Sequence, residues 1–182
     1  METTTLKRTW KVDTNHSTIG FKVKHLGIAE ITGSFTDYEG TVTLADDEFT
    51  LKDISLRIQT DSISTGNVMR DNHLKTEEFF DTGGFPLITF TSTGVTRKSA
   101  SQFAVDGLLK IKDVSKPVQL LAEKLGLARD MWGNEVAAFQ VLGSFNRLDY
   151  NVKWHQFLDN GAAVISNEIT LNILVELQPE AE

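Results

Sequence analysis

The chain has 182 residues, of which 40% are hydrophobic and 24% charged, as in an ordinary globular protein. It contains no cysteine, which excludes disulfides, thiolate catalysis and cysteine-ligated zinc, and its net charge of -7 argues against a nucleic-acid partner. No apolar run approaches the roughly 20 residues of a membrane-spanning helix, so we expect no membrane span. The length suits a single domain over residues 1–182, ordered from about 8 to 178.

The first residues, METTTLKRTWKVD, lack the apolar stretch of a secretory signal peptide. We therefore expect a cytoplasmic protein. A periplasmic or secreted protein would look the same once its signal peptide had been removed.

Alternation of apolar and polar residues predicts β-strands along most of the first third of the chain. We expect bends at Gly33 and Gly40, because glycine weakens a strand and often marks a bulge. The acidic run Asp46 to Glu48 predicts a hairpin turn. The expected strands are residues 10–25, 31–44 and 49–63.

Residues 70–91, RDNHLKTEEFFDTGGFPLITFT, interrupt this alternation. One or two short helical turns suit the apolar residues Val68, Leu74, Phe79 and Phe80, and a turn follows at Asp81, Gly83, Gly84 and Pro86. A strand restarts at Leu87. We interpret the insertion as a lid across one end of a barrel.

The second half returns to alternating strands, with a loop expected at residues 126–134. Pro117 marks the start of one of them. The strands are residues 103–111, 118–124, 136–145 and 169–177. With about eight strands in all, closure avoids exposed edges, which predicts an all-β, antiparallel eight-stranded barrel with a short helical insertion. The residues expected to point inward are Ile19, Phe21, Val23, Leu109, Ile111, Leu171 and Ile173.

Such a barrel is either filled by its own side chains or holds one small ligand, and periodicity does not decide between the two. Small strand residues favour unfilled volume, unless they only relieve crowding at barrel corners. These residues are Gly20, Gly107, Ala137, Ala138 and Gly143.

Four stretches carry a more specific pattern. The first runs from Trp10-Lys11-Val12-Asp13 through His16-Ser17, Phe21 and His25 to Gly33-Ser34-Phe35. The second contains Arg70-Asp71, His73-Leu74, Phe79-Phe80-Asp81 and Phe85-Pro86, with Ile88 and Phe90. The third is Leu109 to Leu120, with Lys116-Pro117-Val118, and the fourth is Asn146-Arg147 with Asp149-Tyr150. In order and spacing they resemble the YceI-like family over nearly the whole domain.

The resemblance implies an extended, lipocalin-like barrel whose apolar interior binds a polyisoprenoid, a quinone-like lipid or another long-chain amphiphile. A homodimer is compatible with it. It implies no cofactor and no catalytic or metal-binding residue. The ligand-binding residues that we predict are Phe21, Val23, Phe35, Leu56, Ile58, Arg70, His73, Leu74, Phe79, Phe80, Phe90, Gly107, Leu109, Phe139, Arg147, Tyr150 and Trp154.

The chain departs from the family pattern at three positions. Asp113 and Asn151 stand where glycine is common, and Gly84 stands where lysine is usual. Asparagine tolerates a left-handed backbone, so Asn151 can replace glycine in a turn. The missing lysine argues against a shared contact with an anionic headgroup.

Arg70 and Arg147 each stand near an aspartate, Asp71 and Asp149. Each arginine could form a salt bridge that holds the lid to a strand. Alternatively, the guanidinium groups could bind a phosphate or carboxylate headgroup at the mouth of the barrel, because their forked donors match such oxygens.

Catalytic patterns are weak. The four histidines show no recognised ligand spacing, which favours structural roles for them. Asp13, His16 and Ser17 offer an acid, a base and a nucleophile, but three such close neighbours seldom achieve triad geometry, so we interpret His16 and Ser17 as polar groups that satisfy a turn. Asp81-Thr82-Gly83 resembles half of an aspartic-protease dyad, but a single copy is present and we interpret it as a turn. No nucleotide-binding or nucleophile-elbow motif occurs.

We therefore predict non-catalytic binding, storage or transport of a lipid. The alternative is an enzyme that acts on an isoprenoid with His73 or His16 as its acid-base group. A filled barrel that serves only as a partner-binding scaffold is a third hypothesis.

Overall fold

The computed structural model describes residues 8–45 and 50–180, which contain eleven strand segments, one α-helix and two short 3-10 helices. The predicted turn at Asp46 to Glu48 lies outside these residues. The elements are β1 (Arg8–Val12), β2 (Thr18–His25), β3 (Ala29–Phe35), β4 (Tyr38–Leu44), β5 (Leu51–Gln59), η1 (Thr60–Ser62), β6 (Ile63–Ser64), α1 (Val68–Leu74), β7 (Leu87–Arg97), β8 (Gln102–Ile111), β9 (Val114–Arg129), β10 (Glu135–Asn146), η2 (Arg147–Tyr150) and β11 (Ile165–Pro179).

Three pairs of segments each act as one interrupted strand. β11 pairs with β2 over residues 165–174 and with β1 over residues 177–179, so β1 and β2 lie end to end along it. β4 pairs with β1 and β3 pairs with β2, so β4 and β3 form the second interrupted strand. β5 pairs with β4 and β6 pairs with β3, and these two segments form the third. With β7 to β11 the segments close into one antiparallel barrel of eight strands, which confirms the predicted fold class.

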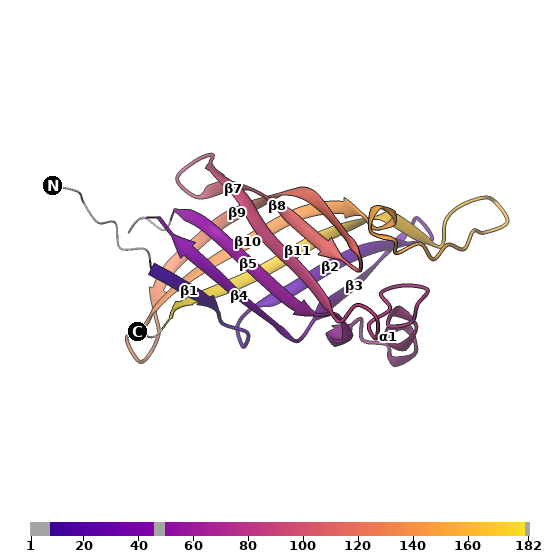
Figure 1. The fold of residues 1–182 in the computed structure, drawn as a ribbon, viewed down its shortest axis with the longest axis horizontal. Coiled ribbons are helices and arrows are strands. Elements are labelled where there is room, and N and C mark those ends of the chain that lie inside the picture. Colours follow the sequence, from indigo (N-terminus) through magenta and orange to yellow (C-terminus); the bar gives the residue numbers. More distant parts are fainter. Residues whose placement is uncertain (1–7, 46–49, 181–182) are drawn as a thin grey trace.

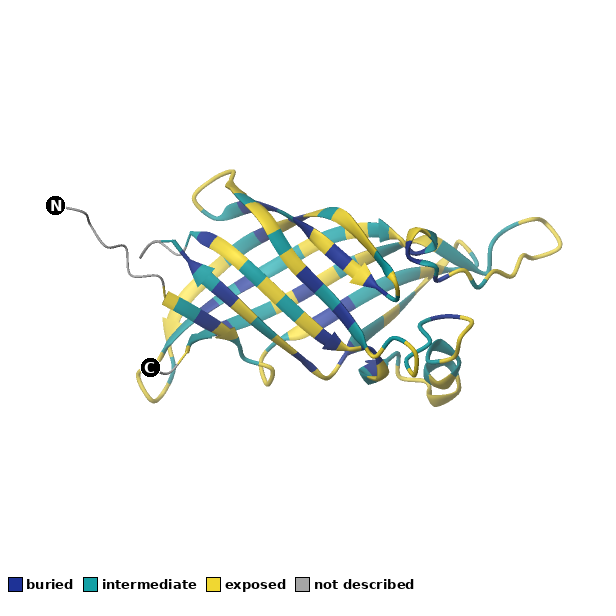
Figure 2. Ribbon diagram, viewed as in Figure 1, coloured by how far each residue is buried: buried dark blue, intermediate teal, exposed yellow. Residues whose placement is uncertain are grey.

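Alternation along the strands separates the core from the solvent, as the stripes of buried and exposed residues in Figure 2 show. On β8, Val105 and Leu109 are buried at 2% and 8% exposure, whereas Leu108 between them is 44% exposed. The barrel wall therefore presents one apolar face inward, as expected from the sequence.

The strand predicted over residues 31–44 is interrupted at Thr36 and Asp37, where the chain hydrogen-bonds to the η1 region. It is not interrupted at Gly33 and Gly40, which lie inside β3 and β4. At Gly33 the missing side chain makes room for the ring of Phe21, which would overlap any Cβ there. The glycines therefore serve packing in this strand, and the prediction of bends at them was wrong.

β9 is longer than predicted at both ends, beginning at Val114 and continuing to Arg129. Pro117 lies inside it, where β10 pairs with β9 only from Leu121 onward, so the proline occupies an edge position on that side. Gly126 lies next to a register shift and pairs with Ala138. The predicted loop is thus limited to the turn after Arg129.

Residues 65–86, which we call the cap segment, connect β6 to β7 and contain α1. Figure 1 shows α1 at one end of the elongated barrel, together with the loop that follows η2, whereas β1 lies toward the other end. The helix ends at Leu74, and the predicted second helical turn around Phe79 and Phe80 is a series of turns. No helix of the described chain is long and apolar enough to cross a membrane.

Candidate functional site

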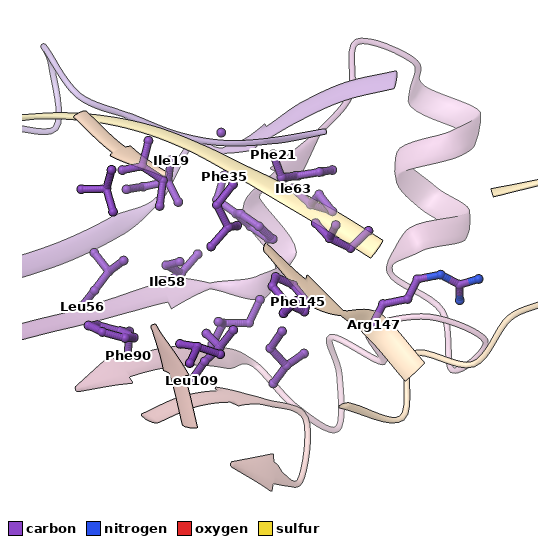
Figure 3. Close-up of a pocket in the computed structure, with 18 of the residues that line it drawn as sticks. Ile19, Phe21, Phe35, Leu56, Ile58, Ile63, Phe90, Leu109, Phe145 and Arg147 are labelled. Atoms are coloured by element: carbon purple, nitrogen blue, oxygen red, sulfur yellow. The ribbon is translucent and has the colours of Figure 1, made fainter. Parts of the chain in front are cut away.

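The barrel encloses a cavity of about 400 Å³, and every strand contributes to its lining. This volume is within the range of small-molecule sites. Figure 3 shows part of the lining, with the apolar side chains converging on one space. The seven residues that we expected to point inward all line it: Ile19, Phe21, Val23, Leu109, Ile111, Leu171 and Ile173.

Most of the predicted ligand-binding residues also line the cavity. They come from strands on all sides of the barrel, from the cap segment and from the loop after η2. The lining includes Phe21, Val23, Phe35, Leu56, Ile58, Arg70, His73, Leu74, Phe79, Phe80, Phe90, Leu109, Phe139, Arg147 and Trp154. Their contact with a ligand remains a prediction.

Polar lining residues are few and are concentrated at the α1 end of the cavity. Ser55 on β5 is the exception. Arg70 contacts Thr65, and Arg147 and His73 both contact Trp154. The polar lining residues are His25, Ser55, Thr65, Arg70, His73 and Arg147. The cavity is therefore apolar along the barrel and polar at one end.

An aromatic cluster closes that end. Phe79 of the cap segment stacks on Trp154 with ring centroids 5.3 Å apart and an interplanar angle of 26°. The His73 ring contacts both by its edge, at 5.0 Å from Phe79 and 5.8 Å from Trp154, and its Nε2 pairs with Glu78. Phe79 is only 6% exposed. The cap segment is thus held to the loop after η2 by ring contacts.

α1 presents one face to the cavity. Asn67 caps the helix, its side chain accepting a hydrogen bond from the backbone N–H of Arg70 at 3.0 Å. Helical spacing places Arg70, His73 and Leu74 on the face that lines the cavity. On the outer face, Met69 is 85% exposed.

Arg147 is the most deeply buried charged residue among those described, at 3% exposure. Its Nε donates to the backbone oxygen of Ser166 at 3.0 Å. Its Nη1 donates to the backbone oxygens of Val152 at 2.7 Å and Trp154 at 2.9 Å, and Nη2 to Asn167 Oδ1 at 3.4 Å. Burial lowers the pKa of Arg147. The guanidinium therefore ties the loop after η2 to β11 through neutral acceptors.

Arg70 uses fewer of its donors. Its Nε donates to Thr65 Oγ1 at 2.7 Å and its Nη2 to the backbone oxygen of Thr65 at 2.9 Å. Thr65 in turn donates to Asp71 Oδ1, from Oγ1 at 2.6 Å and from its backbone N–H at 2.8 Å. Asp71 thus reaches Arg70 only through Thr65.

The salt bridges proposed from the sequence do not form. In the described chain no carboxylate lies within 4.0 Å of the nitrogens of either guanidinium group, and Asp149 pairs instead with Lys116 at 3.9 Å. The 3-10 turn of η2 separates Arg147 from Asp149, since Arg147 is buried while the Asp149 side chain is 53% exposed. This correction leaves two cavity-lining arginines without a carboxylate partner.

Comparison with known proteins identifies the fold and the family. Residues 10–177 match the model of the YceI-like domain. The chain belongs to the YceI-like family. It is 34% identical over 169 residues to Protein YceI of Escherichia coli O157:H7, covering 92% of this chain and 85% of that protein.

Solved structures of YceI proteins have the same fold as this chain. The crystal structure of the Campylobacter jejuni YCEI protein aligns with a TM-score of 0.73 at 32% identity, covering 93% of this chain and 96% of that one. A polyisoprenoid binding domain from Saccharophagus degradans aligns with a TM-score of 0.65, covering 94% of this chain and 98% of that one. Because its identity is 16%, that comparison shows the shared fold alone.

Two predicted ligand-binding residues lie outside the lining, Gly107 and Tyr150. The ring of Phe90 lies over Gly107 and would overlap any Cβ there, so the space beside this glycine is already occupied. Tyr150 is buried behind Phe145, with ring centroids 5.3 Å apart. Gly107 and Tyr150 therefore affect the lining through the rings that they contact, those of Phe90 and Phe145. Unfilled volume therefore does not come from Gly107, contrary to the hypothesis drawn from small residues.

Several lining residues were missed in the sequence. Val141 and Phe145 lie on the inward face of β10, which they share with the predicted residue Phe139. Their orientation was obscured because residues on both faces of this strand are apolar. Thr65 and Val152 lie in connections, where no periodicity indicates orientation.

The group Asp13, His16 and Ser17 lies away from the cavity lining. His16 Nδ1 and Asp13 Oδ2 are 2.7 Å apart, which lowers the pKa of Asp13 and raises that of His16. Ser17 Oγ accepts a hydrogen bond from the backbone N–H of Glu176 at 2.9 Å, so the hydroxyl serves the strand and not the histidine. Asp13, His16 and Glu176 bring one possible metal-ligand atom each within 4.8 Å, and of these side chains only that of His16 is largely exposed to solvent.

Asp81 is also committed to local structure. Its backbone is left-handed, with φ of 48°, and its Oδ1 accepts a hydrogen bond from the backbone N–H of Gly84 at 3.3 Å. The Asp81-Thr82-Gly83 sequence is therefore a turn, as expected.

Proposed function

We propose that this YceI-like protein binds a polyisoprenoid or a similar long-chain amphiphilic lipid inside its barrel, for storage or transport and without chemical conversion. The observation that carries the proposal is the interior cavity of about 400 Å³, apolar along the barrel and polar at the α1 end. A chain of this kind matches that gradient, because its hydrocarbon is buried while its headgroup finds polar partners.

Burial supplies enough affinity for such a role. Each CH₂ removed from water contributes about 0.8 kcal/mol, so three or four isoprene units contribute more than about 10 kcal/mol before the cost of immobilisation. The Saccharophagus degradans neighbour described as polyisoprenoid binding is consistent with this ligand class. The enzyme alternative gains less support, since His16 lies away from the lining and the His73 ring is held between Phe79, Trp154 and Glu78.

The direct test is native mass spectrometry of the protein purified from its own source, followed by extraction and identification of the bound molecule. We expect an added mass that organic extraction removes and that contains a long hydrocarbon chain. A matched pair of variants locates it. Leu109→Trp places a large ring in the cavity and should abolish the added mass, whereas Leu108→Trp, on the outer face of the same strand, should retain it.

Three results would contradict the proposal. One is a protein that carries no lipid and takes up no prenol or prenyl phosphate. Another is equal loading of the folded Leu109→Trp and Leu108→Trp proteins, because the ligand would then lie elsewhere. Turnover of a prenyl substrate that is lost in His73→Gln would favour the enzyme instead.

A further inference from the structure

The cavity occupies only part of the barrel interior. On four strands, one residue marks its boundary toward the β1 end, opposite α1 (Figure 1), and no described residue of the same strand lines the cavity beyond that point. These boundary residues are Val12 on β1, Val42 on β4, Val105 on β8 and Phe139 on β10. They belong to different sides of the barrel, so together they mark the level at which the hollow part ends.

The barrel is filled beyond this level. Side chains on one face of a strand recur at every second residue, so the next inward position on each strand lies two residues nearer the β1 end. These positions are Trp10, Leu44, Phe103 and Ala137. All four are between 0 and 3% exposed, yet none of them lines the cavity. The Phe103 ring lies next to that of Phe139, with ring centroids 6.5 Å apart. The cavity thus ends on a floor of packed side chains.

The volume between this floor and the cap segment limits the chain that the barrel can enclose. A methylene group needs about the 30 Å³ that a water molecule occupies in the liquid, so a cavity of about 400 Å³ accommodates roughly 13 carbon atoms, or about three isoprene units. Any further part of a longer chain would leave the cavity at the α1 end. Burial of apolar surface supplies the affinity, so that part would add little to it.

We propose that the barrel is a pocket closed at the β1 end that selects a short prenyl chain of about three isoprene units, with the floor at Phe139 and Phe103 setting the enclosed length. The inference rests on the proposed function and narrows its ligand class by chain length. The end of the hydrocarbon rests on the floor, and the polar end of the lipid lies toward α1. Side chains at the floor are therefore the residues that determine chain-length specificity.

Ala122 is the position at which the floor can be raised. It lines the cavity from β9, is 2% exposed and pairs with Phe103 in the ladder between β8 and β9. A leucine there extends into the hollow part, so it shortens the cavity without displacing packed atoms. Val42→Leu makes a smaller change from β4, four places away in the strand order of the barrel. Ala128→Leu is the matched control, because Ala128 is an exposed residue of the same strand as Ala122.

The test compares geraniol, farnesol and geranylgeraniol, which share a hydroxyl headgroup and gain one isoprene unit at each step. Binding to lipid-free protein is followed by intrinsic fluorescence, since Trp154 lines the cavity. We expect farnesol to bind roughly a hundredfold or more tightly than geraniol, because one more unit is buried. Geranylgeraniol should bind within about threefold of farnesol, because its additional unit finds no room.

The variants should move this limit. Ala122→Leu should weaken farnesol binding by roughly tenfold or more and leave geraniol binding unchanged, because the shorter chain does not reach the floor. Val42→Leu adds one methylene group and should weaken farnesol binding by about threefold. Ala128→Leu should leave all three affinities unchanged. Thermal unfolding of each variant identifies those that fold, and Val42→Leu carries the test if Ala122→Leu does not fold.

Each contrary outcome has its own meaning. A geranylgeraniol affinity that exceeds that of farnesol as much as farnesol exceeds geraniol overturns the closed end while leaving lipid binding intact. Failure of all three alcohols to bind overturns the proposed function itself. Unchanged farnesol binding in the folded variants at Ala122 and Val42, or an equal loss in Ala128→Leu, overturns the assignment of the floor.

Discussion

Asn151 Nδ2 donates a hydrogen bond to Asp113 Oδ1 over 3.1 Å, joining the turn between β8 and β9 to the turn after η2. These are two of the three positions at which the chain departs from the YceI-like pattern, and glycine is usual at both. Asn151 adopts φ of 60°, the left-handed conformation expected of it. The hydrogen bond lowers the pKa of Asp113. The two departures are therefore complementary, since each side chain is the other's partner.

The first prediction tests the backbone of Asn151. Asn151→Gly keeps access to the left-handed conformation and loses only the hydrogen bond to Asp113, whereas Asn151→Ala also strains the backbone. We expect the alanine variant to be less stable than the glycine variant by about 1 kcal/mol. Urea unfolding of both variants measures the difference, and equal midpoints would show that the left-handed backbone at position 151 costs alanine no stability.

The second prediction concerns Gly107, which lies under the ring of Phe90. Gly107→Ala should push that ring into the cavity and destabilise the barrel by about 1–3 kcal/mol through overpacking. Phe90→Leu in the same protein should recover part of the loss. Gly94→Ala on β7 is the control, because a Cβ there meets no atom within 4 Å. If the Gly107 and Gly94 variants unfold at the same temperature, the ring does not need the glycine.

Period-two alternation explains why the barrel could be predicted from the sequence. On β8 the inward residues Val105 and Leu109 are recognised from local spacing, and the same rule places Ile19 and Ile173 correctly. A pattern of this kind reports which face of a strand is apolar. This inference uses only the residues of one strand, so it can be made without knowing which segments pack against that strand.

Contacts between segments distant in sequence could not be predicted in this way. The acceptors of Arg147 include backbone atoms of Trp154 and Ser166, which no side-chain pattern indicates. A salt bridge between Arg147 and Asp149 was expected because the two residues are close in the sequence, which was the only information on their positions. Gly107 was misread for a similar reason, since the ring that fills its space comes from β7.

The third prediction is a pH dependence at Asp13 and His16. The pKa of Asp13 lies below 3.8, chiefly because of its hydrogen bond to His16, so its contribution to stability is present above pH 3.8 and lost as the pH falls through the lowered value. The pKa of His16 lies above 6.5, chiefly because of Asp13, so its contribution is complete below pH 6.5 and lost as the pH rises through the raised value.

Both contributions are therefore present between pH 3.8 and 6.5. We expect the unfolding temperature of the unmodified protein, relative to His16→Asn, to be highest in that window and to fall on either side. Glu176, 3.9 Å from His16, should reinforce the effect. A difference that stays constant from pH 3 to 9 would show that the ion pair does not form in solution.

The last prediction concerns the cap segment and release of the ligand. Lipid exchange from a closed barrel requires a segment to move, and short helices and turns open more easily than strands that share continuous hydrogen bonds. Phe79 joins the cap segment to Trp154 by stacking, and Phe80 contacts Phe35 edge-on at 6.1 Å. Truncating both phenylalanines to alanine should therefore raise the off-rate of a bound polyisoprenoid more than it lowers barrel stability.

Phe139→Ala provides the comparison, because Phe139 lines the same cavity from β10 and is 2% exposed. Its truncation should cost about 3–5 kcal/mol of stability, as for a core phenylalanine, while the cap segment stays closed. Stopped-flow release and thermal unfolding, measured on both proteins, separate the two effects. If the Phe79 and Phe80 double variant released lipid at the original rate and lost as much stability as Phe139→Ala, these rings would be ordinary core residues. The gate would then have to lie elsewhere, because a cap that controls exchange must change the release rate when its contacts are removed.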